Sequence, residues 1–251
     1  KGVLSEMGFS NVISDIDVTD LSQLGPVFEE FNPDFVINCV GLIKQLSGSE
    51  DPKEAIKINS LVPHQLASLS DKWSARLIHF STDCVFSGKA GLRTEEDIPD
   101  AFDIYGRSKL LGEVDYGSHL TLRTSIIGHE IASNVSLVDW FLSQEGIIKG
   151  FSRAIFSGFP SVFIAEFIED YIIPNPNFKG LYHFSANPID KFSLLSLINE
   201  VYNASQDVEE HSVVEIDRSL NSNNLRASLK FVPPSWYELI QKMHAEYKEY
   251  F

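Results

Sequence analysis

Sulfur and long apolar stretches are scarce in this chain of 251 residues. Its two cysteines, Cys39 and Cys84, lie inside apolar runs, so we expect buried free thiols rather than a disulfide or a reactive pair. No apolar stretch approaches the ~20 residues that a membrane-spanning helix needs. No signal peptide opens the sequence. A cytoplasmic chain with no membrane as a partner is therefore expected.

Basic residues are also few. Lys and Arg total 20 against 35 Asp and Glu, which gives a formal net charge of −15 at pH 7. Nucleic acids and anionic membranes are bound through basic surface, so no nucleic acid is expected as a partner. No group of Cys and His has the spacing of metal ligands, so no metal site is predicted. An anionic small molecule remains a candidate partner, because it needs only a local arginine or a helix N-terminus.

Strands and helices alternate along the first half of the sequence. Apolar runs at 12–17, 35–40, 76–81 and 120–123 predict strands. Helices are predicted between them: one after a cap at Thr19 or Asp20, one over 51–70 with an interruption near Pro63, and one from Tyr105 to about Tyr116. This alternation predicts an α/β fold with a doubly wound parallel sheet.

The second half has a looser pattern. Helices are predicted at 136–144, 162–171, 192–203 and 235–250, and strand runs are fewer, with 180–185 as one. A smaller, mixed α/β lobe is expected here. The predicted boundary separates residues 1–125 from residues 126–251, with some segments of the second part returning to the sheet.

Polar side chains close the predicted strands. Asp17, Asn38, Thr82 and Thr124 each stand at a strand end. In a doubly wound sheet, ligands bind outside the carboxyl ends of the strands. These residues are therefore expected to line one binding edge.

Tyr105 and Lys109 stand four residues apart on a predicted helix, so both project from one helical face. A phenol is a weak acid, with a pKa of about 10, and a neighbouring ammonium lowers that pKa. Thr82 could hold the same substrate oxygen that exchanges a proton with Tyr105. The three residues suit reduction of a carbonyl or oxidation of an alcohol. The Tyr-x-x-x-Lys spacing alone is close to chance, and a half-buried tyrosine beside a solvated lysine is the structural alternative.

Several segments follow one another in the order of a known family. They are Asp17-Val18-Thr19-Asp20, Asn38-Cys39-Val40-Gly41, Asn59, Ser81–Gly88, Tyr105–Glu113, Leu122–Ser125, Arg218–Ser222 and Pro233–Trp236. With these segments the chain resembles the extended short-chain dehydrogenase/reductases, and within them the dTDP-4-dehydrorhamnose reductases. The resemblance spans nearly the whole chain, and only the segments around Thr82 and Tyr105 are specific by themselves.

The resemblance implies NAD(P)H-dependent reduction of the 4-keto group of a nucleotide-diphospho-6-deoxyhexulose, in polysaccharide-precursor synthesis. The sugar would be dTDP-4-dehydrorhamnose or a UDP-linked analogue, and a homodimer is a candidate assembly. Residues 1–125 would bind NADP(H) or NAD(H), and residues 126–251 would mainly bind the sugar nucleotide. The implied catalytic residues are Thr82, Tyr105 and Lys109. The implied cofactor ligands are Asp17, Val18, Asn38, Cys39, Val40, Asn59, Tyr105, Lys109 and Thr124. The implied substrate ligands are Thr82, Asp83, Cys84, Ile126, Arg153 and Arg218.

The chain departs from the family pattern at three places. The Gly-rich phosphate loop is absent, so by family analogy a β-α-β segment of about 40 residues is expected before Lys1. That segment carries the residues that distinguish NADPH from NADH, so the preference is not readable. Cys84 stands where the rhamnose-forming enzymes have a Tyr, and Ile126 where they have a Trp. The two smaller side chains suggest a different or bulkier hexulose, such as an N-acetylated or UDP-linked one.

Two other functions fit the same resemblance. A nucleotide-sugar epimerase or dehydratase would hold NAD tightly, but a 4,6-dehydratase needs Asp-Glu after the active-site Thr, and Cys84 follows Asp83 here. A non-catalytic, nucleotide-binding regulatory subunit could retain both Tyr105 and Lys109. Oxidation of NADPH with a ketosugar would distinguish a reductase from such a subunit. Arg123 is expected to be a structural anchor, and His129 and His183 are expected to be satisfied by hydrogen bonds.

Overall fold

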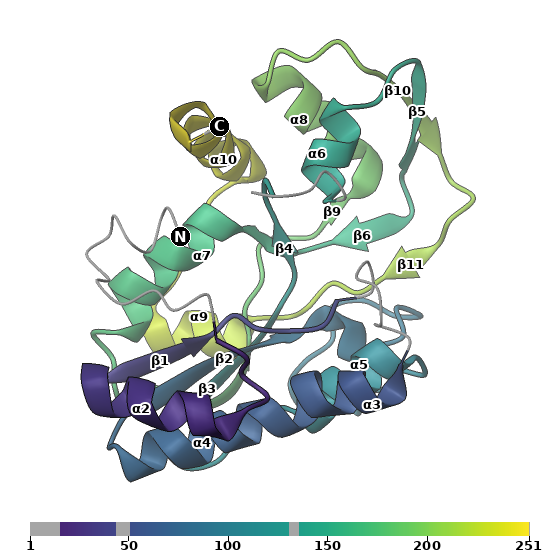
Figure 1. Cartoon of the computed structure of the whole chain (residues 1–251). Coiled ribbons are helices and arrows are strands. Elements are labelled where there is room, and N and C mark those ends of the chain that lie inside the picture. Colours follow the sequence, from purple (N-terminus) through teal and green to yellow (C-terminus); the bar gives the residue numbers. More distant parts are fainter. Residues whose placement is uncertain (1–15, 44–50, 131–135, 251) are drawn as a thin grey trace. The chain divides into compact units, whose positions relative to one another are not determined.

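The computed structural model describes residues 16–43, 51–130 and 136–250, and Figure 1 shows the chain. The strand predicted at 12–17 falls largely outside these residues. The chain forms two compact units. The first holds the chain up to Ser87 together with Ile98–Arg123 and Asn175–Tyr182. The second holds Gly88–Asp97, Thr124–Pro174 and the chain from His183 onward.

A four-stranded sheet is the centre of the first unit. Its strands lie in the order β1 (Phe35–Asn38), β2 (Arg76–Thr82), β3 (Leu120–Thr124) and β8 (Gly180–His183). The first two strands are parallel, with Phe35 opposite Arg76 and Asn38 opposite His79. The predicted parallel α/β sheet is therefore confirmed, and Asn38, Thr82 and Thr124 each end a strand, as expected.

Helix α2 (Leu21–Phe31) begins and ends where the sequence predicts. The side chain of Asp20 accepts a hydrogen bond from the backbone N–H of Ser22 and caps the helix. At the other end, Asn32 takes the left-handed conformation with a φ of 40°, directly before Pro33. A short-range signal at each end thus defines this helix.

The segment predicted as an interrupted helix consists of α3 (Pro52–Ala55), the π-helical turn η1 (Ile56–Leu61) and α4 (Val62–Lys72). Pro63 lies in the first turn of α4, where its missing N–H removes few helical hydrogen bonds. Helices α2 and α4 pack on the sheet through an apolar cluster (Figure 1). Its buried members are Leu24, Val62, Leu66, Ala67, Leu77 and Val114.

Two further helical segments belong to the first unit. The short turn η2 (Asp83–Val85) follows β2 directly, and α5 (Ile104–Leu111) lies beside η1 and α3 (Figure 1). The prediction that this helix reaches about Tyr116 is wrong, because it ends at Gly112. A Cβ atom on Gly112 would lie 1.9 Å from the carbonyl oxygen of Asn59, so the chain passes η1 too closely for any larger residue.

The second unit contains more strands than the sequence pattern indicated. In chain order its elements are β4 (Ile126–Ile127), α6 (Leu137–Leu142), β5 (Ile147–Phe151), β6 (Ala154–Phe156), β7 (Phe159–Pro160), α7 (Ser161–Phe167), the π-helical turn η3 (Ile168–Ile172), β9 (Ile189–Asp190), α8 (Lys191–Val201), β10 (Asp207–His211), β11 (Ile216–Asp217), α9 (Asn223–Leu229) and α10 (Trp236–Tyr250). The strands pair as β10-β5, β11-β6-β9 and β4-β7. The expectation of few strands is wrong because strands of two to five residues are too short to show an alternating pattern.

Two apolar cores stabilise the second unit. One surrounds Phe141, Leu194 and Ile240, from α6, α8 and α10. The other is aromatic, with the ring of Phe167 packed on that of Phe184 at a centroid distance of 4.1 Å and on that of Phe231 at 4.9 Å. None of the described helices combines the length and the apolar character that spanning a bilayer requires.

Candidate active site

Thr82 is the last residue of β2 and is held from several directions. Its Oγ1 accepts a hydrogen bond from the backbone N–H of Cys84 at 3.1 Å and donates to Oδ1 of Asp83 at 3.2 Å. Its hydroxyl is also hydrogen-bonded to that of Tyr105. Thr82 and Asp83 are both buried. The strand end therefore presents a fixed hydroxyl to the tyrosine.

Helix α5 approaches this strand end closely because it carries a glycine. Asp103 caps the helix by accepting from the backbone N–H of Gly106 at 2.8 Å. A Cβ atom on Gly106 would lie 2.2 Å from the carbonyl oxygen of Cys84. Only glycine permits this contact between α5 and η2, and the contact brings Tyr105 to Thr82.

Burial is the main influence on the acidity of Tyr105. It raises the pKa of the phenol to about 12, while the hydrogen bond with Thr82 lowers it and the nearby Cys84, Asp83 and Asp103 raise it further. The expectation that Lys109 lowers the pKa below its usual value is not met. Tyr105 therefore keeps its proton at neutral pH and can act only as a proton donor there.

Lys109 lies one turn beyond Tyr105 and is buried. Its Nζ donates a hydrogen bond of 2.6 Å to the backbone carbonyl of Phe80 in β2. Burial lowers the pKa of the ammonium to about 8, and the negative charge of Glu113 acts in the opposite direction, as does Cys39 when its thiol is ionised. The alternative in which Lys109 is a solvated lysine on the helix surface is thus excluded.

The end of β1 is shaped by Asn38 and a buried histidine. Asn38 donates through Nδ2 to Nδ1 of His79 at 3.0 Å, and its Oδ1 accepts from the backbone N–H of Val40 at 3.1 Å. Burial, followed by the charges of Lys109 and His64, holds the pKa of His79 well below its usual value. His79 is therefore neutral and can accept the hydrogen bond that orients Asn38.

Asn59, in η1, connects the turn after β1 to helix α5. Its Oδ1 accepts from the backbone N–H of Leu42 at 2.8 Å, and its Nδ2 donates to the carbonyl of Leu42 at 3.0 Å and to Oγ of Ser108 at 3.1 Å. Ser108 in turn donates to the carbonyl oxygen of Tyr105 at 3.0 Å. The amide is buried and fully used inside the protein, so we expect any effect on a cofactor to be indirect.

The remaining predicted cofactor ligands lie at the edge of the first unit or next to it. Cys39 and Val40 are exposed after β1. Both cysteines of the chain are free thiols, as expected, but the expectation that they are buried is wrong, because Cys39 is exposed and Cys84 only half-buried. Asp17 is exposed, and hydrogen bonds from the side chain and then the backbone of Thr19 lower its pKa. Val18 is half-buried against the core. Thr124, which ends β3, is buried and donates to the carbonyl of Ser125 at 3.3 Å.

Three predicted substrate ligands belong to the second unit. Ile126 is 54% exposed on β4. Arg153 forms an ion pair of 2.6 Å with Glu215, and both side chains are exposed. Arg218 lies directly after β11, where its Cγ would be 3.1 Å from a Cβ atom on Gly88. Their role toward a sugar nucleotide stays a prediction.

Sequence reasoning gave no role to Glu113, although it lies in the segment that resembles the family. Arg123 binds its carboxylate at two points, with Nε–Oε1 at 2.8 Å and Nη2–Oε2 at 2.7 Å. The prediction that Arg123 is a structural anchor is thereby confirmed. Its place four residues after Lys109 was the only signal in the sequence.

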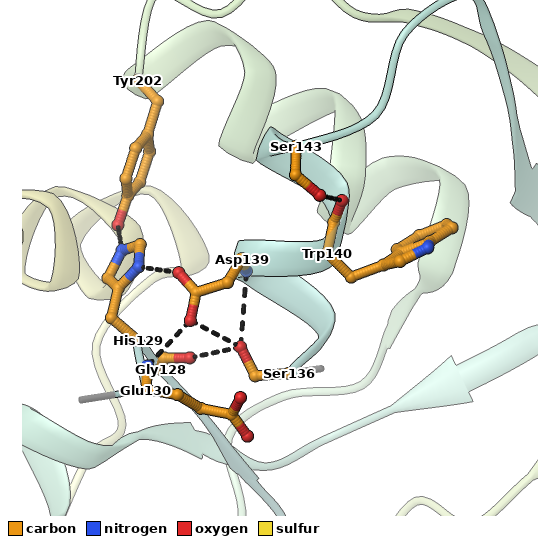
Figure 2. Close-up of polar contacts among 8 residues, drawn as sticks. All are labelled: Gly128, His129, Glu130, Ser136, Asp139, Trp140, Ser143 and Tyr202. Carbon is orange, nitrogen blue, oxygen red and sulfur yellow. Dashed lines mark hydrogen bonds and ion pairs between the residues drawn. The ribbon is translucent and has the colours of Figure 1, made fainter. Parts of the chain in front are cut away.

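A second buried polar cluster lies in the second unit and is drawn in Figure 2. His129 contacts Oδ1 of Asp139 through Nδ1 at 2.5 Å and the hydroxyl of Tyr202 through Nε2 at 2.8 Å. Oδ2 of Asp139 accepts from the backbone N–H of Glu130 at 2.7 Å and from Oγ of Ser136 at 3.0 Å. This cluster joins the segment after β4 to α6 and α8.

Both histidines singled out in the sequence are satisfied, as predicted. His129 has partners at both ring nitrogens, and His183 contacts the carbonyl oxygen of Arg93 through Nδ1 at 2.9 Å. In the described part of the chain, no group of three or more His, Cys, Asp or Glu residues is placed to hold a metal ion.

Known proteins resemble this chain over different lengths. A probable low-salt glycan biosynthesis reductase from Haloferax volcanii is 35% identical over 109 residues, which is 43% of this chain and 36% of that protein. A dTDP-4-dehydrorhamnose reductase from Aggregatibacter actinomycetemcomitans is 25% identical over 185 residues, or 70% of this chain and 63% of that one. The methionine adenosyltransferase 2 subunit beta from Rattus norvegicus is 23% identical over 210 residues, or 75% and 60%. The chain thus spans less than two thirds of the length of these relatives.

The fold is that of a solved reductase. The crystal structure of dTDP-4-dehydrorhamnose reductase from Bacillus anthracis, in complex with NADP, superposes with a TM-score of 0.78 at 24% identity, covering 92% of this chain and 87% of that one. This likeness confirms the predicted Rossmann-like α/β fold. The model of the family described as RmlD substrate binding domain matches residues 5–249. The chain therefore belongs to the RmlD substrate-binding-domain family.

Proposed function

We propose that the protein reduces the 4-keto group of a nucleotide-diphospho-6-deoxyhexulose with NADPH or NADH. The observation that carries this proposal is the hydrogen bond between the hydroxyls of Thr82 and Tyr105, one helical turn from the buried Lys109. Two relatives support the direction of the chemistry, since one is a dTDP-4-dehydrorhamnose reductase and another a probable glycan biosynthesis reductase. Synthesis of a polysaccharide precursor is the setting that we propose.

The end of β1 fits a dinucleotide. A Cβ atom on Gly41 would lie 3.9 Å from Nζ of Lys109, so this turn runs beside the ammonium. Cys39 and Val40 are exposed in the same turn, and the buried Asn38 and Asn59 fix its backbone. Lys109 would hold the ribose hydroxyls next to the nicotinamide, and the exposed turn would cover one side of the dinucleotide. When bound, the dinucleotide supplies the hydride that reaches the carbonyl carbon.

Tyr105 completes the reduction. Because its pKa is raised, the phenol holds a proton until a substrate oxygen gains negative charge. As hydride reaches the carbonyl carbon, Tyr105 gives its proton to the oxygen, and the ketone becomes an alcohol. Thr82 fixes the position of that oxygen by hydrogen bonding.

We propose that the sugar is bulkier than dehydrorhamnose, because two protein positions carry smaller side chains than in the rhamnose-forming enzymes. Cys84 is half-buried beside Thr82, and Ile126 is exposed on β4, where the rhamnose-forming enzymes carry Tyr and Trp. Smaller side chains leave more room, as an N-acetylated or UDP-linked hexulose requires. Arg153 and Arg218 are the proposed ligands of its diphosphate, and Arg153 would have to leave Glu215 to bind. We propose that residues 126–251 mainly bind this sugar nucleotide, and that the enzyme is a cytoplasmic homodimer.

Oxidation of NADPH and NADH by the full-length protein, against a panel of dTDP- and UDP-linked 4-ketosugars, tests the function. We expect oxidation with at least one ketosugar, and faster turnover of UDP-linked or N-acetylated ketosugars than of dTDP-4-dehydrorhamnose. Equal or faster turnover of dTDP-4-dehydrorhamnose would contradict the proposed sugar. No oxidation with any member of the panel would contradict the proposed reaction.

A non-catalytic regulatory subunit is the second candidate function. It is favoured by the likeness to the methionine adenosyltransferase 2 subunit beta, which covers 75% of this chain. The same panel separates the two functions. A full-length protein that binds NADPH but oxidises none of it with any ketosugar would support the subunit, and turnover would exclude it.

A further inference from the structure

Glu113 is a buried carboxylate directly behind the proposed catalytic residues. It follows α5 and stands four residues after Lys109, with a backbone N–H that donates to the carbonyl of Leu110 at 3.2 Å. Its side chain is only 7% exposed. A carboxylate in such a place costs stability unless it is paired and hydrogen-bonded, so each of its contacts carries information.

Two strands hold this carboxylate. From β3, Arg123 reaches it with two hydrogen bonds, and the arginine side chain is itself 5% exposed. From β2, Oγ of Ser81 donates to Oε1 at 2.6 Å. Ser81 directly precedes Thr82. The carboxylate is therefore fixed to the same strand end that presents the catalytic hydroxyl.

The same negative charge acts on Lys109. The surroundings of Lys109 contain the carboxylate of Glu113, the thiol of Cys39 after β1 and the imidazole of His79 in β2. His79 is neutral, and burial raises the pKa of the Cys39 thiol above its usual value, although part of that residue is exposed. Glu113 is thus the one carboxylate among these groups. It favours the ammonium in a place where burial disfavours it.

We propose that Glu113 is a positioning residue of the active site, which keeps Lys109 charged and, through Ser81, holds the strand end that carries Thr82. The inference deepens the proposed function and rests on it for its effect on turnover. Its effect on the charge of Lys109 is a property of the protein alone. The inference about Glu113 and the proposed function can therefore fail separately.

The test is an NMR titration of the Lys109 side chain in the full-length protein, together with NADPH affinity as a function of pH. In the native protein Lys109 should titrate near pH 8. In Glu113→Gln the midpoint should move to lower pH, because the attraction is lost and the charge of Arg123 is left unbalanced. Affinity for NADPH at pH 8 should fall about tenfold, the loss expected when one hydrogen bond ceases to be charge-assisted.

Ser81→Ala is the matched control. It removes one hydrogen bond to the carboxylate and no charge, so the midpoint of Lys109 should stay in place while kcat falls through a displaced Thr82. If Glu113→Gln fails to fold, the double variant Glu113→Gln with Arg123→Met removes the pair without leaving a buried charge, and it should also show the lower midpoint.

An unchanged Lys109 midpoint in a folded Glu113→Gln or double variant would overturn the inference. That result would leave the proposed reductase untouched. Conversely, a shifted midpoint in a protein that reduces no ketosugar would support the role of Glu113 and contradict the proposed function.

Discussion

Lys109 donates a hydrogen bond of 2.6 Å to the backbone carbonyl of Phe80. This bond ties helix α5 to β2 two residues before Thr82, and it places a buried ammonium beside the turn that follows β1. The site therefore depends on a charge that the protein stabilises only in part, since burial lowers the pKa of Lys109 to about 8.

The stability of the protein should carry a pH-dependent contribution from Lys109. Its pKa is about 8 in the folded protein and near 10.5 when unfolded, so the unfolded chain binds more protons between these values. Stability from this group is lowest below pH 8 and rises with pH through that window. The stability of Lys109→Met relative to the native protein should therefore fall by about 3 kcal/mol between pH 7 and about pH 10.5.

Urea denaturation of both proteins at several pH values measures this difference. Lys248, which lies in α10, serves as the control position, and Lys248→Met should show no comparable trend. A stability difference between Lys109→Met and the native protein that does not change with pH would contradict the burial of a charged ammonium.

Gly106 should be intolerant of any side chain. In Gly106→Ala the new Cβ would meet the carbonyl oxygen of Cys84 at 2.2 Å, so α5 must move away from η2 at a cost of about 1–3 kcal/mol. The displacement should also separate Tyr105 from Thr82 and reduce turnover.

Gly25→Ala in α2 is the matched control for that substitution. Nothing lies within 4 Å of a Cβ atom at Gly25, and alanine is favoured over glycine inside a helix by about 0.5–1 kcal/mol. Thermal unfolding should show one variant less stable and the other slightly more stable than the native protein. Equal effects of the two substitutions would argue against the close contact.

The cluster in Figure 2 should be important for the stability of the second unit. Asp139→Ala removes the carboxylate that His129, the backbone N–H of Glu130 and Ser136 share as a partner. We therefore expect the free energy of unfolding to fall by about 2–4 kcal/mol. Ser143→Ala removes an exposed hydrogen bond to the carbonyl of Trp140 and should cost less than about 0.5 kcal/mol. Denaturant midpoints of the two variants compare these effects, and similar losses would contradict the central role of Asp139.

Local signals account for the part of the structure that the sequence predicts well. Asp20 and Pro33 mark the ends of α2 because a cap and a following proline act within a few residues. Thr82, Tyr105 and Lys109 could be placed together because strand ends of a parallel sheet meet at one edge, and residues four apart share a helical face.

The remaining features depend on contacts that the sequence does not display. Glu113 meets Ser81 across 32 residues, and no pattern in either segment indicates the pair. The pKa of Tyr105 follows burial, which spacing alone cannot show, and so the expected lowering was wrong. α5 ends at Gly112, where the chain passes close to Asn59, a contact between segments far apart in sequence.

The role of Tyr105 as proton donor is the central claim, and the rate of NADPH oxidation by Tyr105→Phe tests it most directly. The phenylalanine keeps the ring and removes only the hydroxyl, so folding and NADPH affinity should change little. With a ketosugar that the native full-length protein reduces, we expect kcat to fall at least about 10²-fold, because proton transfer from the phenol is lost. A rate equal to that of the native protein would contradict the mechanism.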